Sequence, residues 1–416
     1  MIAFAASLIA AAVLVAISTK HRLWGVAFVL LLLPTYLVRF ELFGLLPMTM
    51  LEVLILTLFV VFLVQDRSSL RAPSRIEWWY VAVALLVIAG VFGMIVTPDL
   101  RAGAGIFKAY ILEPILYFFV FIHTVKSKED LRLCFWALGI SAFVVALAAG
   151  AQYATGWGIP DPWHDLPDRR ATAFYGYPNA VGLYIAPILT LFIGLLFHVK
   201  FFTKSNVLFV LSLILFLLFA LIAARVEGAF IAVAAGTVVM ALFSKWRWWA
   251  IALAVAGVAV GFLFEPVREI LLFQDVSGDV RLALWEGTIN LLKAQPVFGA
   301  GLAAFPMVYD IYRLPSHVEL LLYPHNLFLN FWVELGVLGL AWIVSVLVLV
   351  AAKSVRAIKR SDGYTAVLLG VMACFLVYGL VDVPFFKNDL AVLFWTWLGV
   401  LVVSTRTTGS ERALSQ

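Results

Sequence analysis

Long apolar blocks separated by short polar segments make up almost the whole chain. Because about 20 apolar residues in a helix cross the hydrocarbon core of a bilayer, each block predicts a membrane-spanning helix. Two short blocks near the N-terminus are the weakest predictions, so we expect an all-α, polytopic transmembrane bundle of twelve or thirteen spans. The predicted spans are residues 2–17, 23–38, 43–64, 78–97, 105–125, 132–154, 179–199, 206–223, 229–243, 248–264, 325–350, 364–381 and 389–404.

The composition supports this interpretation. The chain is 64% hydrophobic and 13% charged, whereas soluble domains are nearer half apolar and a quarter charged. We therefore expect a single membrane domain over residues 1–416. The net charge of +5 does not indicate nucleic-acid binding, because the basic residues lie in short loops between apolar blocks. Cys134 and Cys374 fall inside apolar blocks and are interpreted as packing residues.

The distribution of basic residues predicts an orientation. Lysines and arginines are concentrated in alternate loops, beginning with Lys20 and Arg22, and such loops usually face the cytoplasm. Residues 155–178 would then form a first outer loop. Residues 265–324 would form a large outer loop that contains short helices.

The large outer loop carries a candidate ligand-binding helix. Ser277-Gly278-Asp279 predicts a helix start, with Asp279 as the cap. Arg281, Trp285 and Thr288 would share one face of that helix, where an arginine and a tryptophan suit a phosphate beside a sugar ring or an isoprenoid. A cation–π pair between Arg281 and Trp285 that only fixes the loop explains the pattern equally well.

Tyr323-Pro324-His325-Asn326 enters the next apolar block. Proline is favoured at the first helical position, so His325 is predicted in the first turn of a helix. The positive end of the helix dipole would keep the imidazole neutral, which suits a general base. A histidine that only caps the helix is the alternative. Polar residues continue along one helix face at Asn330 and Glu334, and Gly336 and Gly339 predict close helix contact.

The first outer loop ends in a similar way, with Arg170 and then Tyr177-Pro178-Asn179 at the start of a block. Arg170 is a candidate anion ligand, and Asn179 a candidate substrate contact. Arg225 lies between two blocks, where it could bind an anion or pair with Glu227.

Two further groups of charges favour structural interpretations. Lys108 and Glu113 share one apolar block, and we expect them to pair with each other. A group of acidic residues and a histidine in the first outer loop matches no specific metal motif, and we expect no metal ion and no cofactor. Its members are Asp161, His164, Asp165 and Asp168.

Taken together, these motifs resemble the O-antigen ligase and O-antigen polymerase superfamily of bacterial membrane glycosyltransferases. The similarity covers residues 168–340. It comprises the Arg-x3-Trp helix, the Pro-x-x-Gly-x-Gly turn, the His-Asn helix start, the Gly-x-x-Gly pair and the upstream arginine with Pro-Asn. These are Arg281 and Trp285; Pro296, Gly299 and Gly301; His325 and Asn326; Gly336 and Gly339; and Arg170, Pro178 and Asn179. Arg225 departs from the family pattern, because Val226-Glu227-Gly228 follows it where the family often has Ser-Arg-Gly.

The resemblance implies transfer of a glycan from undecaprenyl diphosphate to a hydroxyl group on the outer face of the bacterial cytoplasmic membrane. His325, Arg281 and Arg225 would be catalytic. Arg170, Asn179, Trp285, Tyr323 and Asn326 would bind substrate. The acceptor could be lipid A core, another glycan or a protein. A transporter or flippase of a lipid-linked or anionic substrate, and a scaffold for polysaccharide assembly, stay as alternatives.

Overall fold

The protein was analysed as a computed structural model. The structure describes residues 1–42, 44, 46–66, 77–199, 201–202, 204–315, 321–358 and 363–413.

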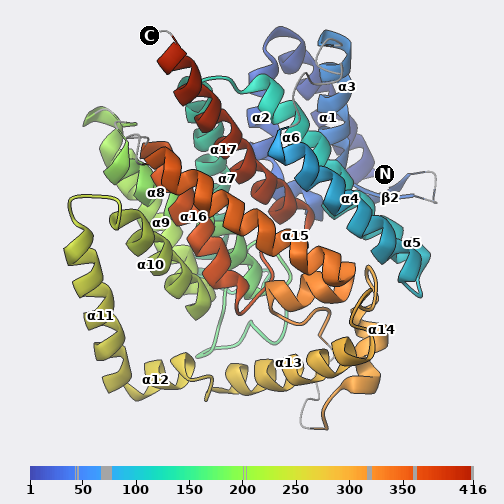
Figure 1. Cartoon of the computed structure of the whole chain (residues 1–416), viewed down its shortest axis with the longest axis vertical. Helices are drawn as coiled ribbons and strands as arrows, with labels where there is room; N and C mark the ends of the chain where they lie inside the picture. Colours follow the sequence, from blue (N-terminus) through green and yellow to red (C-terminus); the bar gives the residue numbers. More distant parts are fainter. Residues whose placement is uncertain are drawn as a thin grey trace.

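Helices dominate the described residues (Figure 1). The first part of the chain forms α1 (Ile2–Lys20), α2 (Arg22–Leu31), α3 (Met50–Gln65), α4 (Trp78–Val96), α5 (Leu100–Ile106), α6 (Glu113–Thr124), α7 (Lys128–Thr155) and α8 (Pro178–His198). The second part forms α9 (Lys204–Ala224), α10 (Glu227–Ala241), α11 (Arg247–Leu263), α12 (Glu265–Leu271), α13 (Val276–Ala294), α14 (Phe305–Tyr309), α15 (Leu327–Ile358), α16 (Gly363–Gly379) and α17 (Asn388–Ala413). Short 3₁₀ helices lie at η1 (Leu33–Leu37) and η4 (Asp310–Tyr312), and the π-helix η3 (Phe107–Leu112) joins α5 to α6.

The helices confirm an all-α polytopic membrane bundle. Within the described residues, eight helices are long and apolar enough to cross a membrane. A ninth span results if α11 and the segment Glu265–Ala294, which are bent by 111°, are counted as one. Four apolar helices are shorter, and the predicted twelve or thirteen spans require that these also cross. They are α2, α3, α10 and α16.

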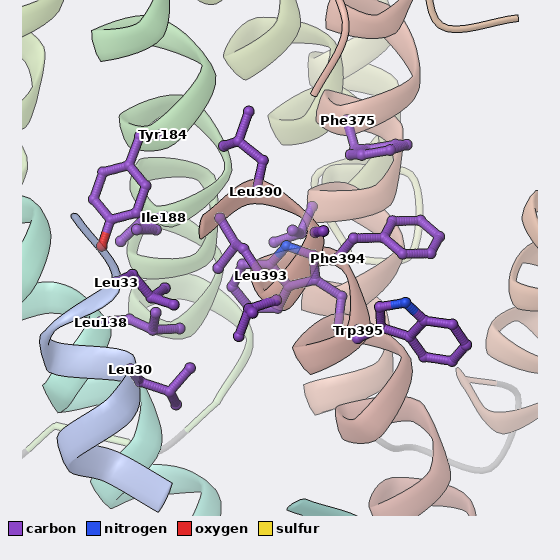
Figure 2. Packing of buried hydrophobic residues seen from close by; sticks show 14 of the residues in the cluster. Leu30, Leu33, Leu138, Tyr184, Ile188, Phe375, Leu390, Leu393, Phe394 and Trp395 are labelled. Atoms are coloured by element: carbon purple, nitrogen blue, oxygen red, sulfur yellow. The ribbon is translucent and has the colours of Figure 1, made fainter. Parts of the chain in front are cut away.

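The centre of the bundle is filled by apolar side chains from segments far apart in the sequence. Figure 2 shows Leu30 and Leu33 beside Leu138 of α7, Tyr184 of α8 and Leu393 of α17. The α17 segment from Asn388 to Arg406 is almost wholly enclosed. Both cysteines are buried and free, which confirms that they are packing residues.

The predicted span 43–64 is wrong at its start. Residues Arg39–Leu42 (β1) pair antiparallel with Leu46–Thr49 (β2), and α3 begins only at Met50. The side chain of Thr49 accepts a hydrogen bond from the Glu52 backbone, and the Glu52 carboxylate accepts one from the Thr49 backbone. This capping box fixes the helix start at Met50, seven residues after the predicted start of the span.

The segment from α12 to α14 lies across one end of the bundle, which we call the loop end (Figure 1). The helix α13 has a small apolar core of its own, in which Leu284 and Leu291 pack with Phe305 of α14 and Val333 of α15. Its N-cap is Asp275, whose carboxylate accepts hydrogen bonds from the backbone of Ser277 and Gly278. The predicted cap at Asp279 is therefore wrong.

A break in α15 anchors the loop end to the membrane helices. Gly336 has φ +66°, and a Cβ atom there would meet the carbonyl oxygen of Val297. The backbone N–H of Val337 donates to that carbonyl at 2.9 Å, while Val333 of α15 accepts from Ala300 at 2.8 Å. Gly336 therefore allows a loop, and not a second helix, to approach α15, which corrects the predicted helix contact.

Candidate functional site

Five segments meet at the loop end. They are the loop before α8, the turn between α9 and α10, the helix α13, the loop before α15 and the loop between α16 and α17. Each carries a polar or charged side chain that contacts another segment. The packing of the bundle therefore brings together residues that are spread over more than half of the sequence.

His325 lies in the centre of this site. Its Nδ1 atom is 3.3 Å from Oδ1 of Asp382, in the loop between α16 and α17. The side chain of Asp382 is 1% exposed, whereas that of His325 is 17% exposed. The histidine therefore links a buried carboxylate to the surface of the site.

The position of His325 differs from the predicted first turn. The helix α15 begins at Leu327, and His325 precedes it with φ +46°, an uncommon conformation for a side chain with a Cβ atom. Asn326 is the capping residue, because its Oδ1 accepts hydrogen bonds from the backbone of Phe328 and Leu329. Because His325 lies outside the helix, its side chain is not directed by the helix and points toward Asp382.

Asp382 is held on both carboxylate oxygens. Oδ2 accepts from Nδ2 of Asn179 at 3.2 Å, and Oδ1 accepts from the backbone of Val383 at 2.8 Å. Burial alone would raise the pKa of this carboxyl, but His325, the Val383 hydrogen bond and Arg281 together hold it below its ordinary value. Asp382 is therefore ionised at neutral pH.

The ionised carboxylate determines the tautomer of the neutral imidazole. A carboxylate can only accept hydrogen bonds, so Nδ1 of His325 must donate its proton to Asp382. The lone pair then lies on Nε2, which is the atom that can accept a proton from another group. The pair thus has the arrangement that a general base requires.

Arg170 connects Asn179 to the turn between α9 and α10. Its guanidinium donates to Oδ1 of Asn179 at 3.3 Å and to the carbonyl oxygens of Ala224 and Arg225 at 3.0 Å each. It also lies over the ring of Trp163, 4.9 Å from the centroid. Burial lowers the pKa of Arg170, and the nearby charges of Arg225 and Arg281 act in the same direction. The three arginines therefore form one cationic group.

Arg225 does not pair with Glu227. It has φ +48°, and its guanidinium bonds to Asp168 at 3.1 Å and to the carbonyl oxygen of Pro167 at 2.7 Å. Its side chain is 42% exposed. Of the two alternatives for Arg225, the pairing with Glu227 is therefore not the one observed, because the side chain is directed to the outer loop.

Arg281 is the least restrained of the three arginines. Nε donates to the carbonyl oxygen of Val381, next to Asp382, at 3.2 Å. In the described part of the chain, no hydrogen bond is formed by its two terminal NH₂ groups. These two groups form the fork that binds phosphate oxygens in a bidentate manner. Arg281 can therefore donate to a ligand without losing its anchor.

Three predicted substrate contacts have structural partners here. Nε1 of Trp285 donates to the carbonyl oxygen of Pro324 at 3.0 Å, so Trp285 fixes the loop that carries His325. Nδ2 of Asn326 donates to the carbonyl oxygen of Leu380 at 3.0 Å. The Tyr323 ring lies 4.4 Å from the His325 ring. Their roles toward a substrate stay predictions, and a cation–π pair of Arg281 with Trp285 is absent from the described residues.

The structure also differs from the ion pair predicted for Lys108. Lys108 bonds to Glu52 at 3.1 Å and not to Glu113. Among the acidic residues of the first outer loop, Asp168 pairs with Arg225 and Asp165 with His164. Within the residues described, no group of three or more histidine, cysteine or acidic side chains is placed to hold a metal ion.

Sequence reasoning missed Asp382. The sequence does indicate that Asp382 is important, because it lies at the end of the predicted span 364–381. An acidic residue in such a position needs a partner or has a function. Its partners were not visible, since Asn179 is 203 positions away.

The fold and this site define a multi-pass membrane protein with a histidine–carboxylate pair beside a group of arginines. Residues 211–344, about a third of the chain, match a protein-family model described as O-antigen ligase. This match confirms the resemblance and supports glycosyl transfer of the O-antigen ligase or polymerase type. It begins after the predicted start at residue 168 and leaves Arg170, Asn179 and Asp382 outside. No curated protein matches the chain.

Proposed function

We propose that this protein transfers a glycan from undecaprenyl diphosphate to an acceptor hydroxyl group at the outer face of the bacterial cytoplasmic membrane. The observation that carries the proposal is the His325–Asp382 pair beside Arg281. A base and a phosphate-binding cation in one site are what displacement of a diphosphate by a hydroxyl group requires.

The reaction follows from these positions. Nε2 of His325 takes the proton of the acceptor hydroxyl, whose oxygen forms a bond to the anomeric carbon of the donor. The bond from that carbon to the diphosphate oxygen breaks, and undecaprenyl diphosphate leaves with the electron pair. Arg281, with Arg225 and Arg170, stabilises the negative charge that develops on the leaving group. Asp382 stabilises the protonated imidazole.

Arginine side chains carry out the charge stabilisation for which other enzymes use a divalent metal ion. We therefore propose metal-independent catalysis, with lipid A core, another glycan or a protein as the acceptor.

A transporter or flippase is the alternative, and transporters often have broken helices that line a substrate cavity. The break of α15 does not favour this function, because the backbone of residues 297–301 occupies it. The test is a reaction of the purified protein in lipid nanodiscs with undecaprenyl diphosphate-linked glycan and each acceptor class. The proposal expects a covalent product. Recovery of only unchanged donor, with all three acceptors, would contradict it.

The orientation is tested separately. The basic side chains Arg22, Lys126 and Arg406 gather at the end opposite the loop end, around Asp66 and Ile122, which supports an external site. In a background without the two native cysteines, Asp165→Cys should react with an impermeant thiol reagent in intact spheroplasts. The control Glu129→Cys, at the opposite end, should react only after lysis. The reverse pattern would place the site in the cytoplasm.

A further inference from the structure

Asn179, at the start of α8, joins two charged groups of the site. Its Oδ1 accepts from the guanidinium of Arg170 at 3.3 Å, and its Nδ2 donates to Oδ2 of Asp382 at 3.2 Å. The family resemblance implies that this asparagine contacts substrate. An asparagine at a helix start can instead cap the helix, but no side chain caps α8. The hydrogen bonds of Asn179 therefore indicate a different role.

The two neighbours of Asn179 determine the orientation of its amide group. An arginine side chain can only donate hydrogen bonds, and an ionised carboxylate can only accept them. The amide therefore satisfies both neighbours in one orientation, with Oδ1 toward Arg170 and Nδ2 toward Asp382. A side chain with only donors or only acceptors could not bond to both.

Tyr378 of α16 is hydrogen-bonded to both Asn179 and Asp382. Its hydroxyl donates to the backbone carbonyl of Asn179 at 3.3 Å, and its own carbonyl accepts from the backbone N–H of Asp382 at 3.0 Å. The tyrosine is 2% exposed, and a Cβ atom at Gly182, one turn further along α8, would meet its hydroxyl. The start of α8 and the loop after α16 are therefore held against the same side chain.

This arrangement leaves one oxygen of Asp382 for His325. Oδ2 is bonded to Asn179, whereas Oδ1 lies 3.3 Å from Nδ1 of His325. A hydrogen bond on each oxygen fixes the plane of the carboxylate. Without the amide, Oδ2 of this nearly inaccessible carboxylate would lose its donor, and a buried charged acceptor that loses its partner is strongly destabilised. The carboxylate could then turn toward another donor and away from His325.

We propose that Asn179 is a positioning residue, which acts on glycosyl transfer by orienting Asp382 and thereby His325, and that Tyr378 supports it. This inference rests on the proposed glycosyl transfer and assigns the asparagine to the base and not to a substrate. Binding of donor and acceptor then depends little on Asn179, whereas the rate of the chemical step depends on it through Asp382.

The first test combines Asn179→Leu with Asp382→Asn. Leucine has the same branched shape as asparagine and removes both hydrogen bonds. We expect the single variant to lower kcat about 10-fold, at the lower end of the cost of a hydrogen bond to a charged group. The KM values of donor and acceptor should stay within about twofold of the wild type. In the Asp382→Asn background, Asn179→Leu should lower kcat by less than about twofold, because the carboxylate that it orients is already absent.

Gln274→Ala, which removes an exposed amide from the segment before α13, is the control and should behave as the wild type. Tyr378→Phe is a second variant, since it removes only a hydroxyl group. It should lower kcat by a smaller factor, and this effect should also disappear in the Asp382→Asn background. If Asn179→Leu fails to fold, Tyr378→Phe decides the outcome.

Three kinetic results would overturn the positioning role. A raised KM for donor or acceptor with unchanged kcat would assign Asn179 to a substrate. Effects of Asn179→Leu and Asp382→Asn that multiply would show that the two residues act independently. An unchanged kcat in both Asn179→Leu and Tyr378→Phe would show that neither residue contributes.

The ring nitrogens of His325 provide a readout without substrates, which separates this inference from the proposed function. In nitrogen NMR spectra of histidine-labelled protein in nanodiscs at about pH 8, where an ordinary imidazole is neutral, the wild type should carry the His325 proton on Nδ1. His325→Ala identifies the signal. Asn179→Leu should increase the fraction with the proton on Nε2, and Gln274→Ala should not. An unchanged spectrum for Asn179→Leu would overturn the positioning role, whereas a changed spectrum in a protein that transfers no glycan would contradict only the proposed function.

Discussion

The three arginines near His325 differ in how their hydrogen-bond donors are satisfied. Arg170 and Arg225 bond to carbonyl or carboxylate oxygens, and Arg281 is anchored through Nε. Among the described residues, the two terminal NH₂ groups of Arg281 form no hydrogen bond, whereas those of Arg225 bond to Asp168 and to the carbonyl oxygen of Pro167. Arg170 and Arg225 are thus fixed by protein partners, whereas Arg281 keeps two donor groups that a ligand can use.

This difference suits the role proposed for Arg281 in binding the diphosphate. A leaving diphosphate requires fixed cations, because stabilisation of a transition state is greatest when the dipoles and charges do not have to reorganise. The following changes test these roles, in order of decreasing effect.

The largest expected effect is that of His325→Ala. Removing the base should slow transfer by about 10²–10⁴, the usual range for a general base, with donor binding largely intact. The control His164→Ala removes an exposed histidine paired with Asp165. Transfer from lipid-linked glycan is measured separately from donor binding. Near wild-type transfer would show that His325 is not the base, and loss of donor binding would assign it to the diphosphate site.

Arg281→Lys should slow transfer by about 10²–10³, because it keeps the charge but loses the planar fork. Donor binding should weaken as well, since the same fork holds the diphosphate. Arg268→Lys, in the exposed helix α12, is the control, because the partner of Arg268 among the described residues is Glu265, at 3.9 Å. Equal rates for Arg281→Lys and the wild type would show that a point charge is enough at this position.

Asp382→Asn should slow transfer by about 10- to 100-fold, the cost of a hydrogen bond to a charged group. Because the pKa of Asp382 is held below its ordinary value, the carboxylate is ionised throughout pH 5–8, and the ratio of variant to wild-type rate should be constant there. Asp165→Asn, on an exposed side chain, is the control. A ratio that changes with pH would show that Asp382 takes up a proton in this range.

Chelation should have the smallest effect. If the three arginines alone stabilise the leaving diphosphate, treatment with a strong chelator leaves the rate of transfer unchanged. A loss of activity that a divalent ion restores would direct attention to the acidic residues of the first outer loop, Asp161, His164 and Asp165.

Local patterns predicted much of the fold and part of the site. Apolar blocks gave most helix positions, and Pro178 begins α8 as expected. Arg281, Arg225 and Arg170 were each predicted as candidate anion ligands, and the structure places them near one another at the loop end. Local patterns gave the wrong helix start where two neighbouring residues or segments could each begin the helix. Pro324 suggested a helix start, but Asn326 caps α15, and the apolar residues 46–49 form a strand that precedes α3.

The sequence by itself determined that this chain is a helical membrane protein, and it singled out the histidine and the arginines for which we propose a role in the reaction. Helix length and hydropathy are properties of contiguous residues, because a bilayer selects each span by its own apolar surface. Only the tertiary structure decided the partners: Asp382 for His325, Asp168 for Arg225 and Glu52 for Lys108. The partner of each charged residue depends on which helix ends meet when the bundle packs. A buried charge pairs with the nearest complementary group in space, whatever the distance between the two residues along the chain.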